Sequence, residues 1–274
     1  MSFRYITFLT DFGVQDDFVG VCRGVMRGIA PDATVIDITH GIPAQAVTQG
    51  AVVLARAIPY MPVCVHLAVV DPGVGSARRP VAVRTTTGRM FVGPDNGLLM
   101  RAADREGVDE ARALTNPRYH LERVSRTFHA RDIFAPAAAH LAAGAHFADL
   151  GEEIDPGDLT RVNLPEPEVG ETRVHATILT VDRFGNLSLN VTREHLDALS
   201  IEAGGWVELQ FALDAYYAQV AETYTDTKRG QLILYEDSYG AIAIAIREGN
   251  AARLTAAGPG DKVRIRATAI PDGS

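Results

Sequence analysis

The sequence is poor in cysteine and has no long apolar runs. Its 274 residues include two cysteines, Cys22 and Cys64, which stand far apart inside apolar stretches. Two such residues argue against a disulfide scaffold or a structural zinc site, and we expect both to be buried free thiols. No stretch reaches the roughly 18 apolar residues of a membrane span. Asp11 interrupts the apolar start of the chain, so no secretory segment is expected and the pattern predicts a cytoplasmic protein.

Positive charge is also in deficit. Lys and Arg total 26 and Asp and Glu total 34, which gives a net charge of 26 − 34 = −8 at pH 7. An acidic surface repels phosphate backbones and anionic lipids, so nucleic acids and membrane surfaces are not expected as partners. The hydrophobic content of 47% is that of a globular protein and argues against disorder throughout the chain.

Strand and helix patterns alternate through the first part of the chain. Strands are expected at 5–9, 34–38 and 63–70, a hairpin at 81–85 and 89–92, and helices at 17–29, 46–57, 97–106 and 133–143. This alternation predicts an α/β fold with a mostly parallel central sheet. Gly20, Gly24 and Gly28 recur every four residues in the first helix, a spacing that predicts close packing of this helix on the sheet.

The composition changes at a segment that contains Pro156, Pro165 and Pro167, which marks a linker. Beyond it, short strand patterns punctuated by glycines cover 174–181, 187–190, 206–211, 232–235, 241–246 and 262–266. Such a pattern is typical of a small all-β barrel or sandwich. We therefore expect an α/β domain over 1–164 and a smaller, barrel-like all-β domain over 170–274.

Polar residues gather where the expected strands of the first domain end. These clusters lie at 10–13, at 37–40, at 71–79 and at 129–132. Ligands of open α/β sheets bind outside the carboxyl ends of the strands. A single aspartate in such a place can instead cap a helix or pin a turn. Four clusters on one rim favour a binding site.

Asp71 ends the most apolar strand and is followed by a turn rich in Pro and Gly at 72–75. Arg78 comes 78 − 71 = 7 residues later, far enough for the loop to fold back and pair the two charges. An Asp beside an Arg keeps its charge and can orient a water or an imidazole; a purely structural salt bridge is the alternative. His129 titrates near neutral pH and could complete a set that holds one water and moves its proton, or it could be structural.

Other catalytic motifs are missing or incomplete. The sequence has no G-x-S-x-G elbow, and the loop after Asp71 lacks the Gly-Lys-Ser/Thr ending of a phosphate-binding loop. Residues 11–13 spell the Asp-Phe-Gly motif of kinases, but no catalytic loop precedes them. His140 and His146 do not have zinc-like spacing.

Six short motifs occur in one order along both expected domains: Leu9–Gly13, Asp37–His40, Val70–Gly75, Gly93–Gly97, Thr127–Asp132 and Asp182–Asn186. In this order they resemble the S-adenosyl-L-methionine (SAM) hydroxide adenosyltransferases, which are adenosine-forming SAM hydrolases related to fluorinase and chlorinase. The resemblance extends over nearly the whole chain. It implies cleavage of SAM by water to adenosine and methionine, without a metal or cofactor, in a homotrimer whose sites lie between subunits.

The resemblance also implies roles for individual residues. Asp71, Arg78 and His129 correspond to the catalytic set of the family. Halogenating relatives have Tyr at the position of Asp71, and Ala130 replaces their halide-binding hydroxyl, so the hydrolase branch is favoured. The implied substrate contacts are Asp11 with the ribose, Asp182 with the methionine ammonium, Asn186 with adenine, Ser238 and Tyr239 with the carboxylate, and Asn250 and Ala251 with adenine.

Two other functions stay open at this point. A metal-dependent nucleotide phosphohydrolase would hold a divalent ion among Asp11, Asp16 and Asp71 and release phosphate. A non-catalytic module that binds SAM or adenosine would retain its ligand without turnover.

Overall fold

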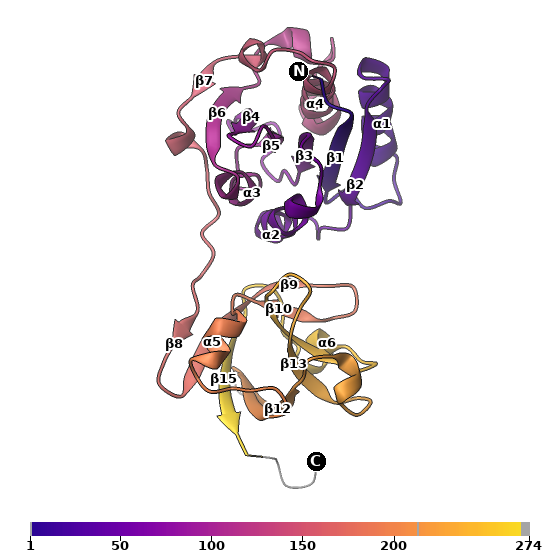
Figure 1. Cartoon of the computed structure of the whole chain (residues 1–274). Coiled ribbons are helices and arrows are strands. Elements are labelled where there is room, and N and C mark those ends of the chain that lie inside the picture. The colour runs from indigo at the N-terminus through magenta and orange to yellow at the C-terminus, as the bar shows by residue number, and fades with distance from the viewer. Residues whose placement is uncertain (1, 213, 270–274) are drawn as a thin grey trace. The chain divides into compact units, whose positions relative to one another are not determined.

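The computed structural model describes residues 2–212 and 214–269. The chain divides into two compact units, Met1–Asn163 and Leu164–Ser274 (Figure 1). No helix of the described residues is long and apolar enough to cross a membrane. Cys22 and Cys64 are buried free thiols, which confirms that expectation.

The first unit is built on a seven-stranded sheet with the order β2-β1-β3-β5-β4-β6-β7. Its strands are β1 (Tyr5–Thr10), β2 (Thr34–Thr39), β3 (Val65–Val69), β4 (Pro80–Thr85), β5 (Met90–Pro94), β6 (Val108–Ala113) and β7 (Glu153–Ile154). β2, β1, β3 and β5 are parallel neighbours, and β4 runs antiparallel to both β5 and β6. Because β7 is antiparallel to β6, five of the seven strands point the same way, and the expected α/β fold is confirmed.

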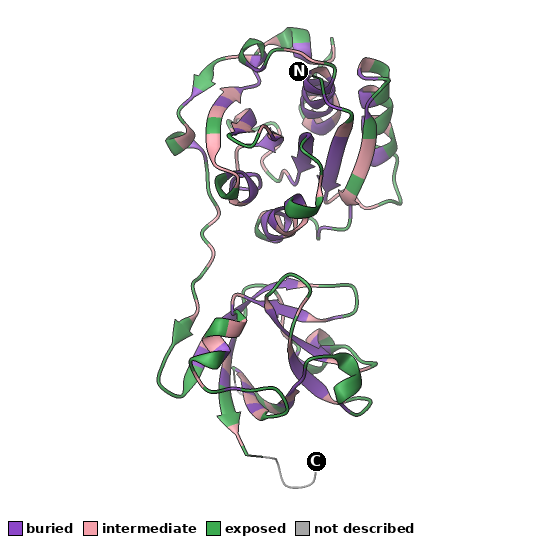
Figure 2. Ribbon diagram, in the orientation of Figure 1, coloured by how far each residue is buried: buried purple, intermediate pink, exposed green. Residues whose placement is uncertain are grey.

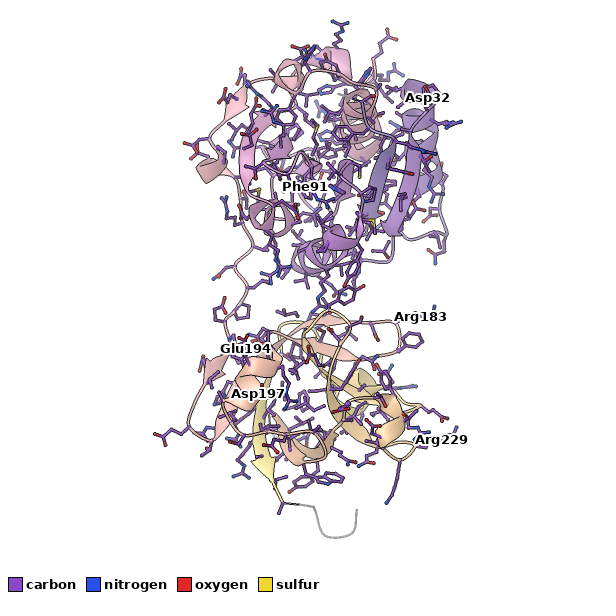
Figure 3. The ribbon with its side chains drawn as sticks, viewed as in Figure 1. Asp32, Phe91, Arg183, Glu194, Asp197 and Arg229 are labelled. Carbon is purple, nitrogen blue, oxygen red and sulfur yellow. The ribbon has the colours of Figure 1, made fainter. Side chains whose placement is uncertain are left out.

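Helices cover both faces of this sheet (Figure 1). α1 (Phe18–Ile29) and α4 (Ala135–Ala142) pack on one face, and α2 (Val47–Ala57) and α3 (Met100–Arg105) pack on the other. Alternate residues of β3 enter the two cores, so the strand is buried on both sides (Figure 2). Phe91 of β5, labelled in Figure 3, is fully buried on the α2 side. The long apolar run before Asp71 therefore forms an interior strand of the sheet.

Several elements of this unit differ from the sequence prediction. α3 begins at Met100 because Gly97 has φ +93° and a Cβ there would lie 2.7 Å from Val162. The helix expected at 133–143 starts earlier, as a π-helical turn at Ala130–Phe134 that continues into α4. β6 was not expected, because its charged residues hide the alternating pattern of a strand near the edge of the sheet.

The prediction that Gly20, Gly24 and Gly28 pack closely on the sheet is wrong. All three lie on the exposed face of α1, and a Cβ added to any of them would meet nothing within 4 Å. The side of α1 that carries Cys22 and Met26 faces the core instead. The four-residue spacing marks a helix face correctly, but it does not show which face is buried.

Replacing Gly24 by alanine is expected to raise the free energy of unfolding by about 1 kcal/mol, because alanine favours the helix and its methyl group meets open space. Chemical denaturation measures this change. Gly75→Ala is the matched opposite: Gly75 has φ +77° and its Cβ would lie 2.6 Å from the Arg126 carbonyl oxygen, so stability should fall. A loss of stability in Gly24→Ala would contradict the open environment of this helix face.

The second unit is a closed barrel. Its strands are β8 (Glu168–Val169), β9 (Arg173–Val181), β10 (Leu187–Leu189), β11 (Trp206–Phe211), β12 (Asp214–Val220), β13 (Leu232–Glu236), β14 (Ile242–Ile246) and β15 (Lys262–Thr268). The order β10-β14-β13-β12-β11-β15-β9 is closed by pairing of β9 with β10, which gives seven strands, and β8 adds to β9. Two short helices, α5 (Arg193–Asp197) and α6 (Ala251–Thr255), complete the unit. The expected barrel-like domain is confirmed, although β12 was not expected.

The proline-rich segment is divided between the two units. Pro156 begins a short 3-10 turn that remains attached to the first unit, where the Thr160 N–H donates to Asp95 at 2.8 Å and Arg161 pairs with Asp104 at 2.9 Å. Pro165 and Pro167 follow the boundary between Asn163 and Leu164.

Candidate active site

Asp71 follows β3, and the next loop returns Arg78 to it. Arg78 Nε donates to Asp71 Oδ1 at 3.0 Å, and Arg78 Nη2 donates to Asp71 Oδ2. The two side chains are only 7% and 5% exposed, respectively. Two parallel charge-assisted bonds hold the guanidinium and the carboxylate in one plane. The Phe134 ring lies beneath the guanidinium, with its centroid 5.2 Å from Cζ.

Local turns give this loop its shape. The Ser76 N–H and Oγ both donate to the Gly73 carbonyl, at 3.0 and 2.6 Å, and the Arg78 N–H donates to Ser76 Oγ at 3.2 Å. Gly75 has a positive φ and packs against the carbonyl of Arg126, where a side chain has no room. The Asp71 loop thus rests on the segment that leads to His129.

His129 joins this pair through Arg78. Arg78 Nη2 lies 3.1 Å from His129 Nδ1. A guanidinium only donates hydrogen bonds, so Nδ1 is the acceptor and the neutral imidazole carries its proton on Nε2. Burial, together with the Arg78 charge, lowers the pKa of His129 from its usual 6.5, so the ring is neutral near pH 7. Arg78 therefore bridges a carboxylate and an imidazole that come from distant segments.

Arg78 also keeps donors available. Its Nη1 atom is buried and has no hydrogen-bond partner among the described residues. A charged donor without a partner in the interior costs free energy, so it needs an explanation, and a catalytic role is one. A polar atom of a ligand bound beside Arg78 would satisfy this donor.

The segment around His129 is held by the fully buried Asp132. Asp132 Oδ2 accepts a bond from the Ser125 N–H at 2.8 Å, and Oδ1 accepts one from Arg131 Nε at 2.6 Å. Ser125 Oγ in turn accepts a bond from the Phe128 N–H at 3.0 Å. His129 precedes the π-helical turn at 130–134, a feature that is frequent at functional sites.

Asp11 lies on the same rim, directly after β1. Because β1 and β3 are parallel neighbours, the residues that follow them emerge at one edge of the sheet. Asp11 Oδ2 accepts a bond from the Gln45 N–H at 2.8 Å, and Gln45 has a φ of +65°, which is strained for a residue with a side chain.

No group of three or more His, Cys, Asp or Glu side chains within residues 2–212 and 214–269 is arranged to hold a metal ion. Both oxygens of Asp71, a ligand that the phosphohydrolase hypothesis requires, are bonded to Arg78.

In the second unit, Asp182 organises the turn that presents Asn186. Asp182 Oδ1 accepts bonds from the N–H groups of Phe184 and Asn186, at 2.8 and 2.9 Å, and Asn186 Nδ2 donates to Oδ2 at 2.8 Å. Arg183, labelled on this turn in Figure 3, lies over the Phe184 ring at 5.1 Å. These bonds give Asp182 a structural role in the turn.

The start of α6 packs against this turn. Gly185 has φ +82°, and a Cβ there would lie 2.2 Å from the Asn250 side chain. The Ala252 N–H donates to the Gly185 carbonyl at 2.9 Å, and Asn250 Oδ1 caps α6 by accepting a bond from Arg253 at 2.7 Å. The structure therefore brings Asn250 and the buried Ala251 next to the turn of Asn186.

Ser238 and Tyr239 lie on a different turn, between β13 and β14. Asp237 Oδ1 accepts bonds from the N–H groups of Tyr239 and Ala241, at 2.9 and 3.0 Å, and Ser188 Oγ donates to Oδ2 at 3.1 Å. Ser238 is exposed, and Tyr239 is 54% exposed. Both residues thus lie at the surface of the barrel unit.

A pocket of about 590 Å³ opens beside the Asn186 turn. Its lining residues are Phe184, Asn186, Tyr224, Ile246, Arg247, Glu248 and Gly249. Asn186 Nδ2 lies 3.4 Å from Tyr224 Oη, which donates to Tyr235 Oη at 2.6 Å. Burial and this hydrogen bond raise the pKa of Tyr235. The pocket offers two partly exposed aromatic rings and an amide, a combination suited to a flat heteroaromatic ligand.

Two domain families match the sequence. The SAM hydroxide adenosyltransferase N-terminal domain matches residues 6–151, and the SAM hydroxide adenosyltransferase C-terminal domain matches residues 176–264. The chain belongs to the SAM hydroxide adenosyltransferase family. The earlier resemblance to this family is confirmed.

Relatives of known structure or function extend over nearly the whole chain. The (R)-S-adenosyl-L-methionine hydrolase of Salinispora arenicola (strain CNS-205) is 45% identical, over 97% of this chain and 99% of its own. A fluorinase from Actinoplanes sp. (strain N902-109) is 27% identical, over 88% of this chain and 90% of its own. The crystal structure of an uncharacterized conserved protein from Thermotoga maritima has a TM-score of 0.89 and 35% identity, over 95% of this chain and 99% of its own.

Among the residues that line the barrel pocket, the sequence prediction missed both aromatic side chains, Phe184 and Tyr224. Phe184 stands inside a motif that was singled out, and its 63% exposure is unusual for Phe. Tyr224 lies in a segment without any motif, so only the fold brings it next to Asn186.

Proposed function

We propose that this enzyme hydrolyses S-adenosyl-L-methionine to adenosine and L-methionine. The observation that carries the proposal is the bridge that Arg78 makes between Asp71 and His129, with a buried donor still available on Nη1. It is supported by membership of the family and by the name of the Salinispora arenicola relative, which specifies the (R) form of the substrate.

The proposed reaction is an in-line displacement at C5′ of the substrate. The oxygen of water forms a bond to C5′ while the bond from C5′ to sulfur breaks, and the electron pair of that bond stays on sulfur. Methionine departs as a neutral thioether, so the leaving group needs no general acid. One proton from the water passes to solvent, which balances the loss of the sulfonium charge.

In this proposal, Arg78 and His129 supply the donors that stabilise the attacking oxygen. Arg78 Nη1 and His129 Nε2 both carry hydrogen. A hydroxide-like oxygen within reach of both would accept two hydrogen bonds, which stabilise its negative charge. Asp71 keeps the guanidinium in place. Attack of hydroxide on a sulfonium cancels charge, so exclusion of bulk water lowers the barrier further.

The substrate contacts belong to the same proposal. A carboxylate can accept two bonds at once, which suits Asp11 to the ribose hydroxyls. In the barrel unit, Phe184 and Tyr224 would contact the faces of adenine and Asn186 its edge. Asp182 with the ammonium, Ser238 and Tyr239 with the carboxylate, and Asn250 and Ala251 with adenine complete the proposed set.

A homotrimer with sites between subunits and a cytoplasmic location are the remaining parts of the proposal. The trimer is supported by membership of the family, whose resemblance implies this assembly. The location is supported by two free thiols, which suit a reducing compartment. Light scattering of the purified protein gives the number of chains directly.

The deciding experiment incubates the purified protein with each sulfonium epimer of SAM in water enriched in heavy oxygen. We expect adenosine with label in its 5′-hydroxyl, methionine as the second product, faster reaction of the (R) epimer, and no effect of a chelator or of added chloride. Retention of SAM without turnover would identify a binding module instead. Loss of activity in chelator that magnesium restores would favour metal-assisted chemistry.

The rate should depend on the protonation of His129. Its pKa is lowered, so the active neutral ring predominates at pH 6.5 and above, and the rate is lost only as pH falls through a midpoint below 6.5. Protonation would place a proton on Nδ1, against the donor of Arg78. A profile of kcat/KM against pH measures the midpoint. An acid limb centred above pH 7 would contradict the proposed role of the neutral ring.

A further inference from the structure

A buried Thr–His pair lies directly behind Asp11. Thr10 ends β1 and is fully buried, and His40, just after β2, is 6% exposed. Thr10 Oγ1 lies 2.9 Å from His40 Nδ1. The same Oγ1 accepts a bond from the Phe12 N–H at 3.2 Å, and the His40 carbonyl accepts one from the Gly13 N–H at 2.8 Å. The two residues that follow Asp11, Phe12 and Gly13, are therefore both hydrogen-bonded through their backbone to this pair.

The surroundings of His40 fix the direction of these bonds. Nε2 of the ring lies 3.2 Å from Asp37 Oδ1, but it makes no regular hydrogen bond among the described residues. A lone pair on Nε2 would face the carboxylate unfavourably, so the hydrogen belongs on Nε2. Nδ1 is then the acceptor and the Thr10 hydroxyl is its donor. Arg23 pairs with Asp37 and fixes the carboxylate from the outer side.

The contacts from the Asp37 carboxylate to the His40 imidazole to the Thr10 hydroxyl have the arrangement of a catalytic triad, but this hydroxyl cannot act as a nucleophile. Thr10 is completely buried, and its oxygen is engaged with the ring and with the backbone of Phe12. The arrangement fits support of the adjacent loop, since both backbone bonds fall within three residues of Thr10.

We infer that Thr10 and His40 are positioning residues, which hold the Asp11 carboxylate where it binds the ribose of the substrate. The inference rests on the proposed function, because it assigns the ribose to Asp11. We call the hydrogen-bonded pair of Thr10 and His40 the brace. The brace fixes the loop on one side of Asp11, and the Gln45 N–H fixes the carboxylate on the other side at 2.8 Å. The brace acts on binding, so its loss should raise KM and change kcat little.

The same strand supplies a matched control. Thr7 is also fully buried on β1, and its Oγ1 lies 2.8 Å from Nδ1 of the fully buried His66. This second Thr–His pair is in the middle of the sheet, where Thr7 and His66 are direct partners in the pairing of β1 with β3. Thr7→Val therefore removes a buried Thr–His bond from the same strand without touching the Asp11 loop.

The experiment compares Thr10→Val, Thr10→Ser and Thr7→Val. For Thr10→Val we expect KM for SAM and the Kd of adenosine to rise about tenfold, the effect of one buried hydrogen bond, with kcat within about threefold of the parent. Thr10→Ser keeps the hydroxyl and should return both constants to within about twofold. Thr7→Val should lower stability and leave both constants unchanged. Nitrogen NMR of histidine should show His40 with its hydrogen on Nε2.

The inference is overturned if Thr10→Val leaves both constants unchanged, or if Thr7→Val raises them equally. Should Thr10→Val not fold, His40→Asn against His40→Leu provides the same comparison, because the Asn oxygen can accept the Thr10 bond and Leu cannot. If the parent protein binds adenosine but does not turn over SAM, the proposed function fails, and the Kd values still decide whether the brace exists.

Discussion

Arg78→Lys is expected to lower kcat by about 10²- to 10³-fold, the usual effect of losing a preorganised donor at a developing charge. Lysine keeps the positive charge, but it cannot bond both oxygens of Asp71, reach His129 Nδ1 and present further donors at the same time. The prediction therefore separates the geometry of the guanidinium from its charge.

Arg79→Lys is the matched control, because it makes the same change at the next position. Arg79 bonds Asp95 through Nε and Nη2, at 2.9 and 2.6 Å, and Nη2 also donates to the Asp158 carbonyl at 2.7 Å. These contacts hold the segment around Asp158, at the end of the first unit, against Arg79 and Asp95. For Arg79→Lys we therefore expect lower stability without a comparable loss of kcat. Steady-state rates with SAM, together with denaturation curves, test both variants. Equal losses of kcat in the two would mean that Arg78 has no special role.

The sequence predicted the framework of the candidate site from simple patterns. The apolar run before Asp71 forms the interior strand β3, and the spacing to Arg78 allows the loop to fold back and pair the charges, as observed. Patterns failed where burial does not follow from local sequence. The charged strand β6 and the exposed glycine face of α1 are both examples.

Atomic connections were beyond any sequence argument. Spacing can suggest that Asp71, Arg78 and His129 meet, but it cannot show that the arginine is the central group, which decides the tautomer of His129. The Thr10–His40 bond joins residues 30 positions apart, and only the pairing of β1 with β2 brings them together. The resemblance to a family suggests the site residues, and the structure adds which of their atoms already have hydrogen-bond partners.

The second large effect is expected when Asp71 is replaced alone. Asp71→Leu leaves the Arg78 guanidinium buried without its carboxylate, which should lower the free energy of unfolding by about 3 kcal/mol. Turnover should fall below detection at the same time, because the guanidinium loses both bonds that hold it. Denaturation and a single-turnover assay measure the two losses, but the single variant does not tell whether low activity is only a consequence of low stability.

The double variant Asp71→Leu, Arg78→Met separates the two effects. Apolar side chains of similar size often replace a buried ion pair with little loss of stability, so most of the lost free energy of unfolding should return. Turnover should stay absent, because the variant lacks the Arg78 donors and leaves only the neutral His129 N–H to stabilise the attacking oxygen. If turnover returned with stability, the pair would be structural and the proposed mechanism wrong. If neither stability nor turnover returned, the loop would depend on the ion pair for its shape. The comparison of Arg78→Lys with Arg79→Lys would then decide whether Arg78 is the catalytic arginine.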